Sequence, residues 1–252
     1  MQNALEIQNV RMDFGSLHAL DGVSFGVDEK SVTILIGPNG SGKTTLINVA
    51  TGLYRPNSGK ILYRGQDVTG LEPHNIYKLG LVRTFQIPAL FTKLAVLENV
   101  LVAKKDNPGE AFSKAFVRRS WSKAEEETVE EAFKILFALG LYNVWEQPAS
   151  SLSGGQMKLL EIARALMSGA KTMLLDEPIS GVNPTLAHEI FQKILRLRDE
   201  RGLTFMIVEH RLDIALSYVD SVVAMAYGRL LLSGKPEAVM TDKRVIDAYL
   251  GG

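Results

Sequence analysis

Short apolar runs, separated by polar and glycine-rich segments, mark the first third of the chain. Those of strand length lie at 5–10, 23–27 and 32–36. The third run leads into a glycine-rich segment and then into residues 44–51, where the pattern predicts a helix. Two shorter runs, 61–63 and 66–69, flank Arg64-Gly65 and predict a β-hairpin.

The last third alternates predicted strands with predicted helices. Strands are predicted at 173–175, 205–208 and 222–226, and helices at 185–201 and 211–219. Gly202 directly follows the first of these helices, as is typical of a helix end. Strand–helix alternation indicates a largely parallel sheet with helices on both faces. Ligands of such sheets bind at the carboxyl ends of the strands.

The middle of the chain, 88–152, has a mostly helical pattern. Within 125–139, apolar residues recur at helical spacing: Val129, Ala132, Phe133, Leu136 and Leu139. We therefore expect an α/β fold with a mostly parallel sheet core, in one domain that spans 1–252. A helical subdomain at about 88–160 is expected to be inserted into that core.

Composition narrows the classes of function. Basic and acidic residues number 28 each, so the formal net charge is zero. A general nucleic-acid binder requires a net positive field, and we expect no nucleic-acid partner. The lack of cysteine excludes disulfides and thiolate metal sites and suits a reducing cytoplasm. The first 13 residues lack the apolar core of a signal peptide, and no apolar run approaches the roughly 20 residues that cross a bilayer.

The glycine-rich segment is the first candidate for chemistry. It reads Gly37-Pro38-Asn39-Gly40-Ser41-Gly42-Lys43-Thr44 and fits the pattern G-x-x-x-x-G-K-[ST]. Glycines let the backbone curl so that its N–H groups point at phosphate oxygens, and the following helix adds its positive end. Lys43 is placed to reach the β- and γ-phosphates and the Thr44 hydroxyl to hold Mg²⁺. A plain glycine-rich turn is the alternative, but a strand before and a helix after are the context that the motif requires.

Two adjacent carboxylates end the apolar strand at 173–175. A strand that served only the core would end in a turn, whereas Asp176 and Glu177 indicate Mg²⁺ chemistry. Asp176 is expected to orient the metal and its waters, and Glu177 to polarise the attacking water.

The segment Leu152-Ser153-Gly154-Gly155-Gln156 precedes an amphipathic helix that runs to about Met167. Ser153 is well placed as the N-cap of this helix. A purely structural cap does not need two glycines followed by glutamine. We therefore interpret the segment as a second anion site at a helix N-terminus.

These motifs, in this order, resemble the nucleotide-binding domain of ABC transporters over essentially the whole chain. The resemblance implies a P-loop NTPase fold with an antiparallel β subdomain, and MgATP as the bound nucleotide. It implies that Phe14 stacks on adenine and that Thr45 joins 37–44 and 153–156 in binding ATP. By the same resemblance Glu177, His210 and Gln86 act in hydrolysis. The implied Mg²⁺ ligands are Thr44, Gln86 and Asp176.

Further segments resemble the ATPases of branched-chain amino-acid importers in particular. They are 82–86, 97–103, 181–184, 208–210, the longer helical region between 104 and 127, and the ending 245–252. Two positions depart from the broad ABC pattern, which has aspartate more often at both: Asn183 and Arg211. An amide donates as well as accepts hydrogen bonds and carries no charge, so communication between paired sites is expected to differ in detail.

The resemblance also implies partners. Two such ATPase subunits, as a homodimer or heterodimer, pair head to tail, with each ATP between the phosphate cradle of one and Ser153–Gly155 of the other. Opening after hydrolysis drives transmembrane permease subunits through Gln86 and the helical subdomain. An extracytoplasmic solute-binding protein delivers the solute. The location implied is the cytoplasmic face of the cell membrane.

Two alternative functions, and the role of one segment, stay open on the sequence alone. An ABC transporter ATPase for another solute, such as urea, amides or exported lipid, has the same motifs. A soluble ABC ATPase of DNA repair or translation fits less well, because the chain has no long coiled coil, zinc site or tandem ATPase domain. The stretch 111–123 mixes aromatic with basic residues, and an amphipathic helix with a solvated face is favoured there over a membrane-subunit contact or a nucleic-acid surface.

Overall fold

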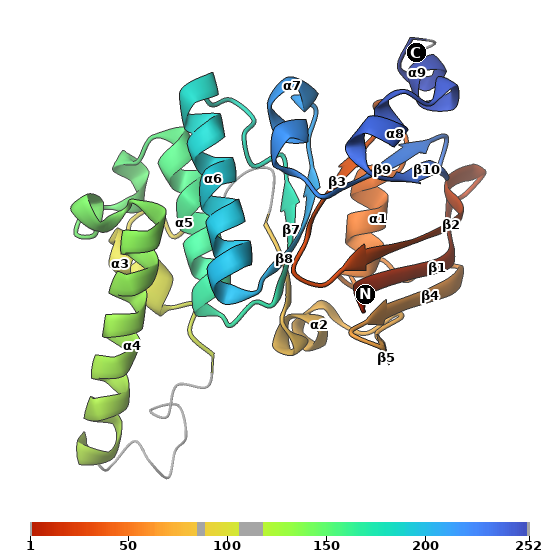
Figure 1. The fold of residues 1–252 in the computed structure, drawn as a ribbon. Coiled ribbons are helices and arrows are strands. Elements are labelled where there is room, and N and C mark those ends of the chain that lie inside the picture. The colour runs from red at the N-terminus through yellow and green to blue at the C-terminus, as the bar shows by residue number, and fades with distance from the viewer. Residues whose placement is uncertain (1, 85–88, 106–117, 251–252) are drawn as a thin grey trace. The chain divides into compact units, whose positions relative to one another are not determined.

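The computed structural model describes residues 2–84, 89–105 and 118–250 (Figure 1). The chain divides into two compact units, one made of 1–86 with 171–252 and the other of 87–170. Gln86 and most of 111–123 lie outside the described residues. Across those described ranges, no helix combines the length and the apolar character needed to cross a bilayer.

The first unit contains an antiparallel sheet in the order β2-β1-β4-β5. Its strands are β1 (Asn3–Phe14), β2 (Leu17–Asp28), β4 (Ser58–Tyr63) and β5 (Gln66–Asp67). The predicted hairpin at 61–69 is confirmed, because Tyr63 pairs with Gln66 across the turn. Arg64 and Gly65 have φ values of 50° and 80°. Both are left-handed, as a tight two-residue hairpin turn requires.

A second sheet of the same unit has the order β10-β9-β3-β8-β7-β6. Its strands are β3 (Val32–Ile36), β6 (Leu81–Arg83), β7 (Thr172–Asp176), β8 (Thr204–Val208), β9 (Ser221–Ala226) and β10 (Arg229–Gly234). Every pairing in it is parallel except that of β10 with β9. The three central strands β3, β8 and β7 are buried along their whole length, as strands covered on both faces must be.

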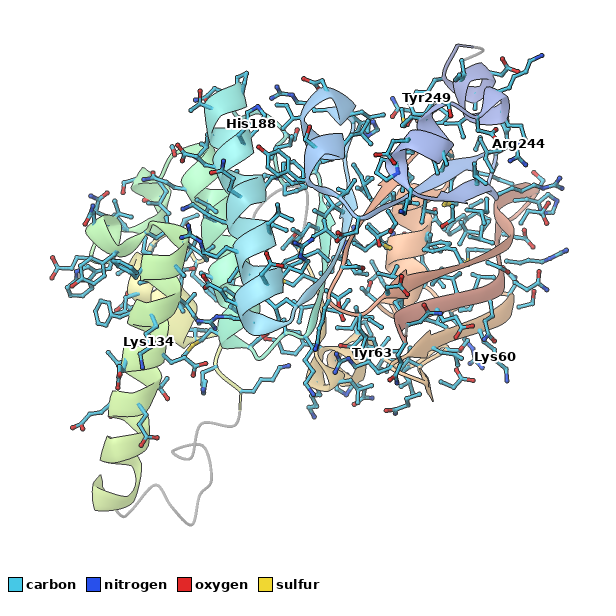
Figure 2. The ribbon with its side chains drawn as sticks, viewed as in Figure 1. Lys60, Tyr63, Lys134, His188, Arg244 and Tyr249 are labelled. Carbon is cyan, nitrogen blue, oxygen red and sulfur yellow. The ribbon has the colours of Figure 1, made fainter. Side chains whose placement is uncertain are left out.

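Helix α1 (Lys43–Ala50) lies between the two sheets (Figure 1). Its apolar residues share one buried cluster with side chains of β1, β2, β4, β3, β8 and β9. Tyr63 joins the sheets as well: its buried hydroxyl donates to Thr172 Oγ1 at 3.4 Å (Figure 2). The remaining helices of this unit are α2 (Pro73–Leu79), α6 (Pro184–Arg201), α7 (Leu212–Ala215), α8 (Pro236–Met240) and α9 (Lys243–Leu250).

The second unit is helical. It contains α3 (Val96–Leu101), α4 (Arg118–Leu139) and α5 (Gly154–Met167), with short 3₁₀ turns at Tyr142–Val144 and Ala149–Ser151. The periodic residues predicted to face inward on α4 are mostly buried, among them Ala132, Leu136 and Leu139. Asn99 of α3 is fully buried and donates to the carbonyl oxygens of Phe91 and Ala95, both at 3.0 Å.

The structure corrects the helix predicted at 211–219. Helix α7 covers only Leu212–Ala215, and a 3₁₀ turn, η4, follows at Leu216–Tyr218. The ring of Tyr218 stacks on Phe191 of α6 with centroids 5.2 Å apart, and its hydroxyl lies 2.7 Å from His188 Nδ1. This packing on α6 accompanies the tighter final turn, which propensity alone does not predict.

The burial of the central strands can be tested by shortening one of their side chains. Leu174 on β7 is 0% exposed, whereas Leu53, in the segment after α1, is 54% exposed. Leu174→Ala should therefore lower the free energy of unfolding by about 2–5 kcal/mol, because it leaves a cavity as well as removing apolar contacts. Leu53→Ala, the matched control, should cost less than about 1 kcal/mol. Urea unfolding of both variants measures the difference, and equal costs would mean that β7 is not in the core.

Candidate active site

The phosphate loop predicted at 37–44 connects the end of β3 to α1. Gly37 and Gly42 have φ values of 154° and 98°. A Cβ atom on Gly37 would lie 2.2 Å from the carbonyl oxygen of Met225 on β9, and one on Gly42 would lie 2.5 Å from that of Ala19 on β2. Only glycine fits at both positions, so the loop is held in its curled form by the strands on either side.

Lys43 is buried inside this loop. Its Nζ donates to the carbonyl oxygens of Gly37 at 2.8 Å and Pro38 at 3.0 Å. Burial lowers the pKa of Lys43, and the nearby carboxylates of Glu177 and Asp176 counteract that shift. The loop thus encloses an ammonium group that neutral carbonyl oxygens hold in place.

Asp176 ends β7 with a buried carboxylate that is paired with Arg83. Arg83 Nη2 lies 3.0 Å from Asp176 Oδ2, and Nη1 of the same guanidinium donates to Asn48 Oδ1 on α1. The backbone N–H of Asp176 donates to Thr84 Oγ1 at 3.4 Å. Sequence analysis did not assign Arg83 a role. The signal that could have found it is an arginine on a short apolar strand just before Gln86.

Glu177 and His210, both predicted to act in hydrolysis, are brought together. His210 Nε2 lies 3.3 Å from Glu177 Oε1. The backbone N–H of Glu177 donates to the carbonyl oxygen of Val208 on β8 at 2.9 Å, and its φ is 51°. A positive φ is uncommon for a residue other than glycine, and such residues cluster at functional sites.

A cleft of about 590 Å³ joins these groups. Of the predicted site residues, its lining includes Phe14, Asn39, Gly40, Ser41, Gly42, Lys43, Thr44, Thr45, Asp176, Glu177 and His210. Phe14 is 43% exposed and packs edge-on against Tyr54, with centroids 5.4 Å apart. Five further lining residues were not identified as site residues from the sequence: Leu17, His18, Ala19, Val208 and Tyr227. Gly37 and Pro38 contact Lys43 within the loop.

The fit for Mg²⁺ can be judged from the donor groups. Among the described residues, no cluster of three or more histidine, aspartate or glutamate side chains could hold a metal on its own. Thr44 and Asp176 do line one cleft. Mg²⁺ is usually held by one or two protein oxygens together with substrate phosphates and waters, so this sparse set suits it.

The segment 152–156 is in the second unit and is described by itself. Ser153 is the N-cap of α5: the N–H of Gln156 donates to Ser153 Oγ at 3.3 Å, and the N–H of Ser153 donates to Gln156 Oε1 at 2.9 Å. Gly155 is buried in the first turn. Among the described residues, a Cβ on Gly154 would meet no atom within 4 Å. Packing in this unit therefore does not require glycine at 154.

Gln86 itself lies outside the described residues, but the segment that follows it is fastened to α5. Glu161 Oε1 accepts from the N–H of Ala89 at 3.2 Å, and Arg164 Nη1 donates to the Ala89 carbonyl oxygen at 2.5 Å. Arg164 also lies over the ring of Phe91, 5.2 Å from its centroid. Neither Glu161 nor Arg164 was identified from the sequence.

Comparison with known proteins shows the family to which this chain belongs. Residues 20–180 match the family described as ABC transporter, and 229–252 match that described as branched-chain amino acid ATP-binding cassette transporter. The chain is 47% identical to the probable branched-chain amino acid transport ATP-binding protein LivG of Archaeoglobus fulgidus, over 98% of this chain and 95% of that protein. It is 36% identical to the high-affinity branched-chain amino acid transport ATP-binding protein LivG of Escherichia coli K12, over 99% and 98%.

Solved structures of proteins from ABC transporters are also similar to this chain. A nucleotide-free ATP-binding cassette from an ABC transporter is 45% identical, with a TM-score of 0.86 over 100% of both chains. The cbiO1 protein from Clostridium perfringens, part of an ABC transporter complex, is 27% identical with a TM-score of 0.81, over 98% of this chain and 94% of that one. The mixed sheets and helices of the fold are those expected of an α/β P-loop protein of this type. The chain therefore belongs to the ABC transporter family and, within it, to the branched-chain amino acid transport ATP-binding proteins.

Proposed function

We propose that this chain is the ATP-hydrolysing subunit of a membrane importer of branched-chain amino acids. One observation carries the ATPase part of the proposal: Lys43, Asp176, Glu177 and His210 line one cleft beside the glycine loop. The solute is inferred from the relatives, which are branched-chain amino acid transport ATP-binding proteins. The solute itself passes through the permease subunits.

ATP lies along the cleft with its phosphates in the loop. Phe14 stacks on the adenine ring, and the N–H groups of 37–45 surround the β- and γ-phosphates. Phosphate oxygens take the place of the Gly37 and Pro38 carbonyl oxygens at Lys43 Nζ. Because a charge-assisted bond to phosphate is stronger than one to a neutral carbonyl, this exchange favours the bound state.

Mg²⁺ would be held by the Thr44 hydroxyl, Gln86 and Asp176 together with the nucleotide phosphates. Arg83 donates to Asp176 Oδ2 and would hold this carboxylate in place for the metal. When bound, Mg²⁺ supplies charge neutralisation at the phosphate oxygens. Glu177 orients the attacking water and accepts its proton, and His210, 3.3 Å from Glu177, lies where the γ-phosphate ends.

The protein works as one of a pair of ATPase subunits on permease subunits. In the pair, Ser153–Gln156 of one subunit meets the γ-phosphate held by the other, and the unit 87–170 is the helical subdomain of a single nucleotide-binding domain. A solute-binding protein supplies the amino acid on the far side of the membrane, and the ATPase lies on the cytoplasmic face. Nucleic acid is not a partner, since the chain has no net positive charge.

Removal of the loop ammonium tests the binding assignment. Lys43→Ala should weaken MgATP binding by about 1.5–3 kcal/mol, roughly tenfold or more, because one buried charge-assisted contact is lost. Titration with a fluorescent ATP analogue measures the affinity. Lys60→Ala, which removes an exposed lysine on β4 (Figure 2), is the control and should bind like the wild type. Wild-type affinity in Lys43→Ala would remove Lys43 from the site.

The carboxylate beside His210 tests the chemistry. Glu177→Gln should lower ATP hydrolysis by roughly 10²–10⁴-fold, because an amide cannot accept the proton of the attacking water. Nucleotide binding should survive, since the loop and Lys43 are intact. Phosphate release measures turnover, with Glu189→Gln on the exposed face of α6 as a control of the same chemistry. Normal turnover in Glu177→Gln would refute its catalytic role.

The same variant gives a test of pairing. Loss of the Glu177 charge removes repulsion of the γ-phosphate, so the ATP-bound pair should be tighter than in the wild type and visible as a dimer by size-exclusion chromatography. Adding Ser153→Arg should abolish that dimer, by placing a long side chain where the partner meets the phosphate. The experiment includes the second ATPase subunit where one is encoded beside this chain. A dimer that persists in the double variant would contradict the assigned interface.

The solute is tested in the assembled transporter. In proteoliposomes that contain this chain with its native permease subunits, leucine, isoleucine or valine presented with the solute-binding protein should stimulate ATP hydrolysis. Urea, presented in the same way, should not. Stimulation by urea alone would keep the ATPase assignment and overturn the proposed solute.

A further inference from the structure

Two loops meet at the carboxyl ends of β7 and β8, which are neighbours in the sheet (Figure 1). One runs from Glu177 to Asn183 and the other contains Glu209 to Arg211. The side chain of Glu209 is 2% exposed and lies between them. Its Oε1 accepts from the N–H of Ile179 at 2.9 Å, and its Oε2 accepts from the N–H of His210 at 3.1 Å. The catalytic mechanism proposed above makes no use of this buried carboxylate.

Arg211 also joins these two loops, but it donates to a carbonyl oxygen, whereas Glu209 accepts from N–H groups. Its Nη1 donates to the carbonyl oxygen of Val182 at 3.1 Å, and its backbone N–H reaches Glu209 Oε2 at 3.5 Å. The guanidinium is also 3.9 Å from the carboxylate of Asp213 on α7. Glu209 and Arg211 together form what we call the loop bracket. One member holds N–H groups at the start of the Glu177 loop and the other holds a C=O group at its end.

The groups around Glu209 shift its pKa in opposite directions. Burial raises the pKa of this carboxyl and the negative charge of Glu177 acts in the same direction, while the N–H groups of Ile179, His210 and Arg211 oppose the shift. Each of these N–H donors needs an acceptor, and both carboxylate oxygens of Glu209 serve as acceptors. A neutral amide of the same size supplies only one.

The bracket accounts for one departure from the ABC pattern, the arginine at position 211. An aspartate at 211 has no hydrogen to donate to the Val182 carbonyl oxygen, whereas arginine does. Val182 is the neighbour of Asn183, whose Oδ1 caps α6 by accepting from the N–H of Leu186 at 2.9 Å. Arg211 of one loop therefore contacts Val182, the residue directly before Asn183 in the other loop.

We propose that Glu209 and Arg211 are positioning residues for ATP hydrolysis: they hold His210 against Glu177 and make the loop 177–183 move together with His210. This inference rests on the proposed function, because it assigns the geometry of that active site. A change at His210 on loss of the γ-phosphate is passed to Asn183 within the same subunit. The bracket acts through His210 and Glu177 and does not touch the nucleotide.

The test uses the assembled transporter and three variants. Glu209→Gln and Arg211→Ala should each lower kcat for ATP roughly tenfold or more, since each leaves a buried or part-buried backbone group beside the active site without its partner. KM and the affinity for the ATP analogue should stay within about twofold, because the phosphate loop is unchanged. Arg211→Lys, which keeps a donor for the Val182 carbonyl oxygen, should recover most of the lost kcat.

Two exposed residues of α6 provide matched controls. Glu189→Gln and Arg196→Ala make the same chemical changes away from the bracket and should behave like the wild type. A role confined to fold stability predicts that kcat and binding fall together, or that Arg211→Lys is no better than Arg211→Ala. Either result, or wild-type kcat in Glu209→Gln, would overturn the proposal.

Hydrogen exchange separates the bracket from the proposed function. In the isolated full-length chain, Arg211→Ala should speed exchange of amides in 178–183, a loop distant in sequence, while Arg196→Ala should not. Unchanged exchange in 178–183 would refute the bracket even where ATP turnover is normal. A wild-type transporter without ATP turnover would refute the proposed function, and the exchange result would still decide whether the bracket exists.

Discussion

The active site depends on the parallel pairing of three buried strands. Val208 at the end of β8 pairs with Leu35 of β3 on one side and with Asp176 of β7 on the other. The carboxyl ends of all three strands are thereby fixed at one edge of the sheet, where the segments starting at Gly37, Glu177 and Glu209 begin. A slip of one residue in either pairing would turn every side chain of a strand to the other face. The full burial of these strands prevents such a slip, so the hydrophobic core sets the spacing of the polar site.

The charged groups at the two ends of the cleft have different kinds of partner: carbonyl oxygens at Lys43 and a guanidinium at Asp176. At the phosphate end, Lys43 keeps its ammonium among carbonyl oxygens, so it is desolvated but not neutralised by a direct carboxylate partner there. At the β7 end, Asp176 is buried beside Arg83, which offsets the cost of burying its charge. Arg83 also bonds Asn48 on α1, the helix that begins at Lys43. The same side chain thus links the Asp176 carboxylate to the helix that follows the glycine loop.

The sequence predicts the parts of this site that depend on local pattern. The strands at 32–36 and 205–208, the glycine loop and the acids after β7 are all visible in short windows, because each needs a particular residue order. Contacts between distant segments are not visible in that way. Arg83 is 93 residues from Asp176, and Glu209 is 30 residues from Ile179. Edge strand β10 was missed because its residues are mostly half-buried and show no clear alternation of polar with apolar positions.

The left-handed turn at Glu177 explains how two adjacent acids serve one cleft. In a continuing strand, successive side chains point to opposite faces, so Glu177 would lie away from Asp176. With φ at 51° the chain leaves the strand, and both side chains line the same cleft. Asp176 contacts Arg83 of β6, while Glu177 contacts His210 after β8. Such a conformation costs on the order of 1–3 kcal/mol for a residue other than glycine. Glycine at this position would relieve the strain, but it would also remove the carboxylate that lines the cleft.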